Sequence, residues 1–245
     1  MEVDKYFNNK LYELISIDNY HNSNPYNFFI YDNCCICNVI KTNQIWEPHM
    51  HAIFEKYINK NSVVIEGGCH IGTHTIKIAE LCKYVHAFEP LPESNKLLNK
   101  NILINKVDNV STYLLGLSNK VGETTFGWCQ ADAPGCAGLN NNPMGIPIYS
   151  KNMDNANKVK LTTIDELELD QLDFIKLDVE GYESLVIQGA LKTIAKFKPI
   201  ITMEIWENHF GSINFDYAKK KFANLINIGY KMEHISGPDF LFIPQ

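Results

Sequence analysis

From residue 60 of this 245-residue chain onward, apolar runs typical of strands alternate with segments spaced like helices. The strand-like runs are SVVIEGG, YVHAFEP, VSTYLLGLS, LDFIKLDVEG, PIITMEIWE, KMEHIS and DFLFIPQ. The helix-like segments are THTIKIAELCK, PESNKLLNKNILIN, ESLVIQGALKTIAKF and DYAKKKFANLINIGY. This alternation predicts an α/β fold with a mostly parallel sheet that helices cover on both faces. Ligands of such sheets bind beyond the carboxyl ends of the strands.

The first of these strands runs into a glycine-rich turn, in the stretch VVIEGGCHIGTHTIKIAE, residues 63–80. Glu66 ends the strand, and Gly67, Gly68 and Gly72 follow it before the helix. Glycines there let the backbone approach a ligand, although many strand-to-helix turns contain glycine only to make the bend. The second strand ends in Glu89, about 20 residues on, where a carboxylate can accept hydrogen bonds from both hydroxyls of a ribose. The two strand ends together indicate a nucleoside-binding site.

The turn differs from that of a dinucleotide site. A pyrophosphate needs bare backbone at a helix N-terminus, which the pattern GxGxxG supplies. The segment EGGCHIG lacks this pattern and offers the carboxylate of Glu66, which suits the ammonium group of a methionyl moiety. We therefore predict S-adenosylmethionine as the cofactor rather than NAD. A structural turn without a ligand is the alternative.

Six segments resemble, in order and spacing, the FkbM-like S-adenosylmethionine-dependent methyltransferases. They are VVIEGGCHIGTHTIKIA, VHAFEPLPESNKLLNKNILIN, LGLSNKVGETTF, LTTIDEL, DFIKLDVEGYESLVIQGA and KPIITMEIWE, within roughly residues 45–245. The most specific is DFIKLDVEGYE with GA after it. The resemblance implies a class I methyltransferase (Rossmann-like) fold, whose seven-stranded sheet has its last strand antiparallel. It also implies methylation of a hydroxyl oxygen, usually on a sugar or natural product.

The resemblance assigns cofactor residues as well. The turn around the methionine part is formed by Glu66, Gly67, Gly68, Cys69, His70 and Gly72, and the ribose is held by Glu89, with Pro90 beside it. Leu115 and Gly116, interpreted as the end of the third strand, are expected near the adenine. The family more often has Asp at position 66 and Ala-Asn at positions 69 and 70. This chain is therefore expected to hold the amino-acid end of the cofactor differently.

Acidic residues at two further strand ends are candidates for catalysis. A protonated sugar hydroxyl is a weak nucleophile, so it needs a general base or a metal ion. The fourth strand ends in LDVEGYE, which carries Asp178 and Glu180, and the fifth ends at Glu204 in TMEIWE. Asp178 is the first candidate for the base or for orienting the methionine ammonium, followed by Glu180 and Glu204; capping or turn roles are the alternative. Glu183 is expected to be structural, because it lies at a helix start.

The sequence predicts no metal site, and several other side chains are interpreted as structural. No Asp-Asn pair follows the fifth strand, where metal-dependent catechol-type methyltransferases place ligands, so metal-independent catalysis is predicted. Trp206 is interpreted as core or pocket wall, and the run CCIC at residues 34–37 as small apolar residues of a strand rather than zinc ligands. The histidines expected to be surface or packing residues are His49, His51, His70 and His74.

The chain is expected to divide into two parts. Residues 1–58 form a mixed N-terminal cap segment, in which a helix is predicted after Pro48, with Ile45, Phe54 and Tyr57 available for packing. Residues 59–245 form the methyltransferase domain. Within it, residues 122–158 are rich in Gly, Pro and Asn and are predicted to be an insertion loop. Its aromatic residues Phe126, Trp128 and Tyr149 offer surface for an acceptor, and a flexible hairpin is the alternative.

Net charge limits the partners. The chain carries a net charge of -6, which gives no overall basic field for a phosphate backbone, so a small-molecule or glycan acceptor is favoured over nucleic acid. An RNA methyltransferase and a catalytically silent nucleotide- or glycan-binding module remain as alternatives. Seven cysteines, an odd number, fit free thiols in a reducing compartment. The first residues lack a signal-peptide pattern and a membrane span, so a soluble, cytoplasmic protein is expected. The oligomeric state stays open.

Overall fold

The structure is a computed structural model, and it describes residues 12–18, 25–31, 34–128, 137–139, 158–207 and 213–245. Its large, seven-stranded sheet has the strand order β12-β13-β11-β10-β3-β4-β5. The strands are β3 (Val63–Gly67), β4 (Tyr84–Phe88), β5 (Val110–Tyr113), β10 (Phe174–Leu177), β11 (Ile200–Glu204), β12 (Tyr230–Ser236) and β13 (Asp239–Pro244). Strands β5, β4, β3, β10 and β11 are parallel, and β13 is antiparallel to β11 and β12. The predicted sheet, with an antiparallel last strand, is confirmed.

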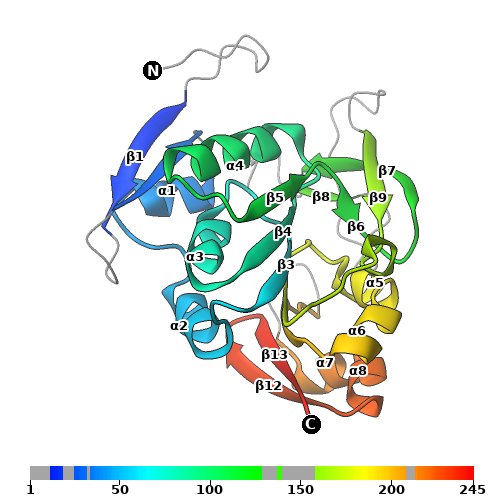
Figure 1. Ribbon diagram of the computed structural model, residues 1–245. Coiled ribbons are helices and arrows are strands. Elements are labelled where there is room, and N and C mark those ends of the chain that lie inside the picture. The colour runs from blue at the N-terminus through cyan, green and yellow to red at the C-terminus, as the bar shows by residue number, and fades with distance from the viewer. Residues whose placement is uncertain (1–11, 19–24, 32–33, 129–136, 140–157, 208–212) are drawn as a thin grey trace.

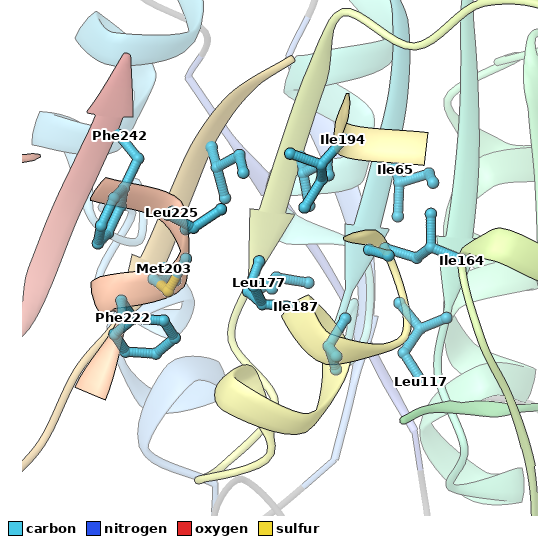
Figure 2. Packing of buried hydrophobic residues seen from close by; sticks show 14 of the residues in the cluster. Ile65, Leu117, Ile164, Leu177, Ile187, Ile194, Met203, Phe222, Leu225 and Phe242 are labelled. Atoms are coloured by element: carbon cyan, nitrogen blue, oxygen red, sulfur yellow. The ribbon is translucent and has the colours of Figure 1, made fainter. Parts of the chain in front are cut away.

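Helices cover both faces of this sheet (Figure 1). One face carries α2 (Pro48–Tyr57), α3 (Thr73–Leu81) and α4 (Pro92–Ile104), and the other carries α5 (Glu183–Gln188), α6 (Leu191–Phe197), α7 (Phe215–Lys221) and α8 (Ala223–Asn227). Neighbouring strand residues point to opposite faces, so Val64 packs with the first group of helices and Ile65 with the second. Figure 2 shows the second core, where Leu177 of β10 lies beside Ile187 of α5 and Met203 of β11 lies beside Phe222.

Two helix boundaries follow from single residues. Pro92 lies in the first turn of α4, a position that suits proline because the N–H it lacks would be unpaired there. Gly189 separates α5 from α6. A Cβ at Gly189 would lie 2.2 Å from the carbonyl oxygen of Ser118, so this junction accepts no side chain.

The N-terminal segment contains a ribbon and two helices. Strands β1 (Glu13–Ile17) and β2 (Tyr26–Ile30) are antiparallel, and α1 (Cys35–Lys41) follows them. The interpretation of residues 34–37 as part of a strand is wrong: Cys34 is the N-cap of α1, and its sulfur accepts a hydrogen bond from the Cys37 N–H at 3.4 Å. Burial of Cys34, Cys37 and Ile40 against β2 stabilises this short helix. The predicted helix after Pro48 is confirmed as α2, with Phe54 fully buried.

A second sheet corrects the prediction of an irregular insertion. Strands β6 (Gly116–Leu117), β7 (Gly122–Trp128), β8 (Ala137–Leu139) and β9 (Lys158–Thr162) form it in the order β6-β9-β7-β8. Both ends of the predicted loop are therefore strands. The β-branched and aromatic residues of ETTFGW and KVKLT favour extended backbone, and this preference outweighs the effect of the nearby glycines. Phe126 packs on the core, so it is not free acceptor surface, and Tyr149 lies outside the described residues.

The end of the third strand also needs correction. Strand β5 ends at Tyr113, and Gly116 and Leu117 pair with Leu161 and Thr162 of β9 instead of extending the large sheet. The run VSTYLLGLS looks continuous in sequence but serves two sheets. Among the described residues, no helix has the length and apolar character needed to cross a bilayer.

Candidate active site

The glycine-rich turn after β3 packs directly against the turn after β10. Gly68 has φ +78°, and a Cβ there would lie 1.7 Å from the carbonyl oxygen of Asp178. The Asp178 N–H also donates to the Gly67 carbonyl at 3.0 Å. Gly72, with φ +91°, passes so close to Leu98 that a Cβ would lie 2.7 Å from its side chain. Positions 68 and 72 therefore require glycine for backbone conformation and packing, before any ligand is considered.

Glu89, directly after β4, binds this turn through one carboxylate oxygen and the start of α4 through the other. One oxygen accepts from the His70 N–H at 2.8 Å, and the other accepts from the Leu91 N–H at 2.9 Å. Burial raises the pKa of Glu89 to about 7, against the lowering effect of these two hydrogen bonds. Each carboxylate oxygen can accept more than one hydrogen bond, so the geometry leaves capacity for ribose hydroxyls. Pro90 follows directly and leads into α4.

Glu66 and Lys176 are charged residues on neighbouring buried strands. They lie opposite each other in the register of β3 and β10, and both side chains are buried. Burial raises the pKa of Glu66, and the charge of Lys176 opposes that rise. Burial disfavours the ammonium of Lys176, but the charges of Asp178, Glu66 and Glu47 outweigh burial and raise its pKa above the ordinary value. Lys176 therefore stays charged, and its Nζ bonds Asp178 Oδ2 at 3.1 Å.

The three predicted catalytic carboxylates lie along one edge, because β10 and β11 are adjacent and parallel. Asp178 and Glu180 follow β10, and Glu204 ends β11. Burial, followed by the charge of Asp178, raises the pKa of Glu180 to about 8. Burial and the charges of Asp178 and Glu180 raise the pKa of Glu204 well above its ordinary value. The Trp206 indole N–H donates to Glu204 Oε2 at 3.1 Å, so Trp206 lines this edge.

Glu183 has the structural role that its position predicted. Its Oε1 accepts from the Val179 N–H at 3.0 Å and from the Gly181 N–H at 3.3 Å, and the side chain is buried. These bonds hold the turn that carries Glu180. Glu183 therefore shapes the strand end without reaching the crevice.

The four histidines expected to be surface or packing residues are buried or partly buried. His51 and His74 are buried, and His49 bonds Asp239 Oδ2 at 2.8 Å. His70, in the glycine-rich turn, contacts the Tyr31 hydroxyl through Nε2, and burial lowers its pKa to about 4. Cys69, in the same turn, is buried, and its sulfur lies 3.3 Å from the Glu66 carbonyl.

Three residues of this region were missed in the sequence: Tyr31, Glu47 and Lys176. Lys176 had a detectable signal, because a lysine inside the apolar run FIKL implies a buried partner. Tyr31 and Glu47 had none, because their contacts with His70 and His74 depend on how the N-terminal segment packs. Among the described residues, no group of three or more acidic, His or Cys side chains is arranged to hold a metal ion.

The family assignment comes from residues 66–240, which match the methyltransferase FkbM domain. The chain belongs to the FkbM methyltransferase family. The FkbM methyltransferase of Methylobacillus flagellatus KT is similar in structure, with a TM-score of 0.51 and 12% identity over 84% of this chain and 52% of that chain. This chain thus spans about half the length of that FkbM protein. At such identity the likeness shows the fold alone, which is the class I methyltransferase fold.

Two further solved structures have lower TM-scores with this FkbM chain. An rRNA methylase from Streptococcus thermophilus has a TM-score of 0.47 and 13% identity, over 82% of this chain and 99% of that chain. The tRNA m1G37 methyltransferase of M. jannaschii has a TM-score of 0.47 and 15% identity, over 97% of this chain and 58% of that chain. The comparison with curated proteins finds no match. The FkbM domain match begins at Glu66, so Tyr31 and Glu47 precede it.

Proposed function

We propose that this methyltransferase transfers a methyl group from S-adenosylmethionine to a hydroxyl oxygen of a sugar or glycoconjugate. One observation carries the proposal: Asp178, whose carboxylate is bonded to Lys176, has its backbone against the glycine-rich turn and lies on the same strand edge as Glu180 and Glu204. A carboxylate group beside a cofactor turn is what hydroxyl activation requires. S-adenosylmethionine, when bound, supplies a methyl group on a positively charged sulfur.

The residues around the turn fit such a cofactor. Glu89 is proposed to bind the ribose, because its oxygens keep lone pairs at the end of β4. Glu66 has no exposed surface, whereas the Asp178 side chain is 26% exposed. Asp178 therefore keeps both predicted roles, as base or as partner of the methionine ammonium, and we give Glu66 the role of counter-charge for Lys176. This revises the role that the turn alone suggested for Glu66.

In the proposed reaction, the acceptor oxygen bonds the methyl carbon while the bond from carbon to sulfur breaks. The hydroxyl proton passes to a carboxylate of this chain, which balances the charge released from the sulfonium. Asp178, Glu180 and Glu204 are the candidate bases, and Trp206 is proposed as a wall of the acceptor crevice. The protein contributes alignment and exclusion of water, because the transfer is an in-line displacement.

Mass spectrometry of candidate glycans incubated with the protein and isotope-labelled S-adenosylmethionine tests the proposal. Methyl incorporation at an oxygen supports it, and EDTA should leave the activity intact. Asp178→Asn should lower kcat by roughly 10² to 10⁴, the usual worth of a positioned base. RNA belongs in a parallel arm, since labelling of RNA alone would exclude the glycan. Loss of activity on chelation, with recovery on adding Mg²⁺, would reassign the acids as ligands, and absence of turnover with every acceptor would indicate a catalytically silent nucleotide- or glycan-binding module.

A further inference from the structure

Glu47 reaches the strand edge from the segment that precedes the FkbM domain. It is the N-cap residue of α2, with φ +46°, a left-handed conformation that is uncommon for a residue with a side chain. Its carboxyl makes no capping bond to the described part of α2. The side chain is instead directed inward, 19% exposed, and its Oε2 lies 3.6 Å from Nε2 of His74. The backbone of α2 therefore presents this carboxyl to α3.

The His74 imidazole faces Glu47 with an unprotonated nitrogen, Nε2. The ring is buried in α3 and has a hydrogen bond with the backbone of Trp46, which we assign to a proton on Nδ1 because Nε2 has no hydrogen-bond partner among the described residues. Burial, with the positive charges of Lys176 and His51, lowers the pKa of His74 well below its ordinary value. The ring is therefore neutral, and Nε2 is an acceptor.

Two acceptors facing each other repel unless a proton lies between them. The surroundings of Glu47 favour that proton: burial and the charge of Asp178 raise its pKa to about 7, opposed by Lys176. Asp239 raises it further, and His49 opposes it, although the His49 imidazole already bonds Asp239. A protonated Glu47 can donate to His74, and rotation of its side chain closes the present gap of 3.6 Å.

Ionisation of Glu47 would alter the neighbouring ion pair. Lys176 bonds Asp178 at 3.1 Å and also feels the charges of Glu66 and Glu47. A negative Glu47 competes for the same ammonium, whereas a neutral Glu47 does not. The protonation state of Glu47 thus bears on how firmly Asp178 is held.

We propose that Glu47 is a positioning residue of the methyltransferase site, protonated in the active enzyme and donating to His74, which reserves Lys176 for Asp178. The proposal rests on the proposed function for its effect on turnover, but its proton assignment does not. It also makes the segment before the FkbM domain part of the catalytic apparatus.

NMR of the full chain tests the proton assignment without an acceptor. Carboxyl signals of ¹³C-labelled glutamate, compared between the wild type and Glu47→Gln, identify the titration of Glu47, which we expect at about pH 7. Histidine ¹⁵N spectra should show His74 neutral, with the proton on Nδ1, down to about pH 5.5. A Glu47 that is already ionised at about pH 6, or a positively charged His74, would overturn the proposal in favour of an ordinary ion pair.

Turnover then tests the consequence. Gln can donate to Nε2 and stays neutral, so Glu47→Gln should rescue the roughly tenfold loss in kcat/KM expected for Glu47→Ala and should remove the titration near pH 7 from the rate profile. Glu55→Gln is the matched control, because Glu55 is also on α2 and its carboxylate pairs with Lys77 at 2.7 Å. Equal losses in Glu47→Gln and Glu47→Ala would contradict the positioning role. S-adenosylhomocysteine binding by the wild type, measured separately, shows whether the proposed function itself has failed.

Discussion

At the scale of single residues, Gly68 shows why the seam after β3 tolerates so little change. It combines a positive φ with a contact between two turns, one carrying the proposed cofactor residues and the other carrying Asp178. Three glycines of this chain separate these effects. Gly229 has φ +94° with open space around its Cβ position, and Gly122 has open space without a positive φ. The protein therefore contains its own controls for backbone strain and for steric contact.

Gly68→Ala should unfold the protein at a much lower temperature than the wild type. The contact at 1.7 Å forces the turns apart, in addition to about 1 kcal/mol or more for the left-handed backbone. Gly229→Ala should show the backbone cost alone, and Gly122→Ala should be near neutral. Thermal unfolding by circular dichroism ranks the three. If Gly68→Ala and Gly229→Ala lose the same stability, the two turns are not in close contact.

Glu89→Ala should weaken S-adenosylmethionine binding by about 1.5 to 3 kcal/mol, the usual worth of hydrogen bonds to a charged group. It should also destabilise the protein, since the His70 and Leu91 N–H groups lose their acceptor. Glu89→Gln separates the two effects, because its amide keeps one oxygen for the backbone. Isothermal titration calorimetry gives the affinity, and an unchanged value in Glu89→Ala would remove this residue from the cofactor site.

At the scale of elements, buried histidines in the turn before α3 and in α3 itself make stability depend on pH. Burial lowers the pKa of His70 to about 4, below its value of about 6.5 in the unfolded chain. The neutral ring therefore stabilises the fold fully above about pH 6.5, and this contribution is lost as the pH falls toward 4. The buried acids act in the opposite direction: Glu89, with a pKa raised to about 7, costs stability as the pH rises from about 4.5 to 7.

His70→Gln should flatten the acid side of the stability profile relative to the wild type. The difference in unfolding free energy between the two proteins should change by up to about 3 kcal/mol between pH 6.5 and pH 4, as the shift in pKa requires. His234→Gln is the control, because His234 is exposed. Urea unfolding at a series of pH values measures this. Parallel profiles for the wild type and His70→Gln would mean that His70 titrates normally in the folded protein.

The spacing of apolar residues predicted the strands and helices that bury one regular face. Local composition gave wrong predictions where tertiary packing determines the secondary structure. The strands of the large sheet and the helix after Pro48 were predictable because their apolar spacing matches their geometry. The run at residues 34–37 begins a helix because Cys34, the N-cap of α1, and Cys37 are buried in a cluster with residues of β1 and β2. In the site, Asp178, Glu180 and Glu204 were predictable from strand ends. The contact of Glu47 was not predictable, because Glu47 reaches His74 through the tertiary packing of α2 and α3, which no sequence pattern marks.

At the scale of the whole molecule, the N-terminal ribbon is attached to α4 by two asparagines. Asn101 Oδ1 accepts from the Phe29 N–H at 2.6 Å, and its amide donates to the carbonyls of Phe29 and Ile71. Asn105 Oδ1 accepts from the Asn27 N–H at 2.9 Å, and its amide donates to the Asn27 carbonyl at 2.6 Å. These bonds take the place of a second strand partner for β2 beside β1, so the ribbon is attached by side chains where a larger sheet would use backbone.

Asn101→Ala should destabilise the protein by about 2 to 4 kcal/mol, because three buried or half-buried backbone groups lose their partner. Asn99→Ala should cost far less, because Asn99 is exposed on the same helix and among the described residues bonds Asn95 and Thr112 alone. Hydrogen exchange should show β2 amides opening before those of β3 in Asn101→Ala. Uniform loss of protection across both strands would show that the ribbon and the large sheet unfold as one unit.

The attachment of the ribbon also sets an order for folding during synthesis. Phe29 and Asn101 are separated by 72 positions, so the ribbon emerges from the ribosome well before its anchor exists. At common rates of translation this interval is roughly 4 to 14 s, far longer than a hairpin needs to form. Throughout it, Tyr12, Phe28 and Ile30, which the finished protein buries, lack the part of their packing surface that α4 supplies. We therefore expect chaperones to bind the nascent N-terminal segment. Slower translation would lengthen the time for which its apolar side chains are exposed.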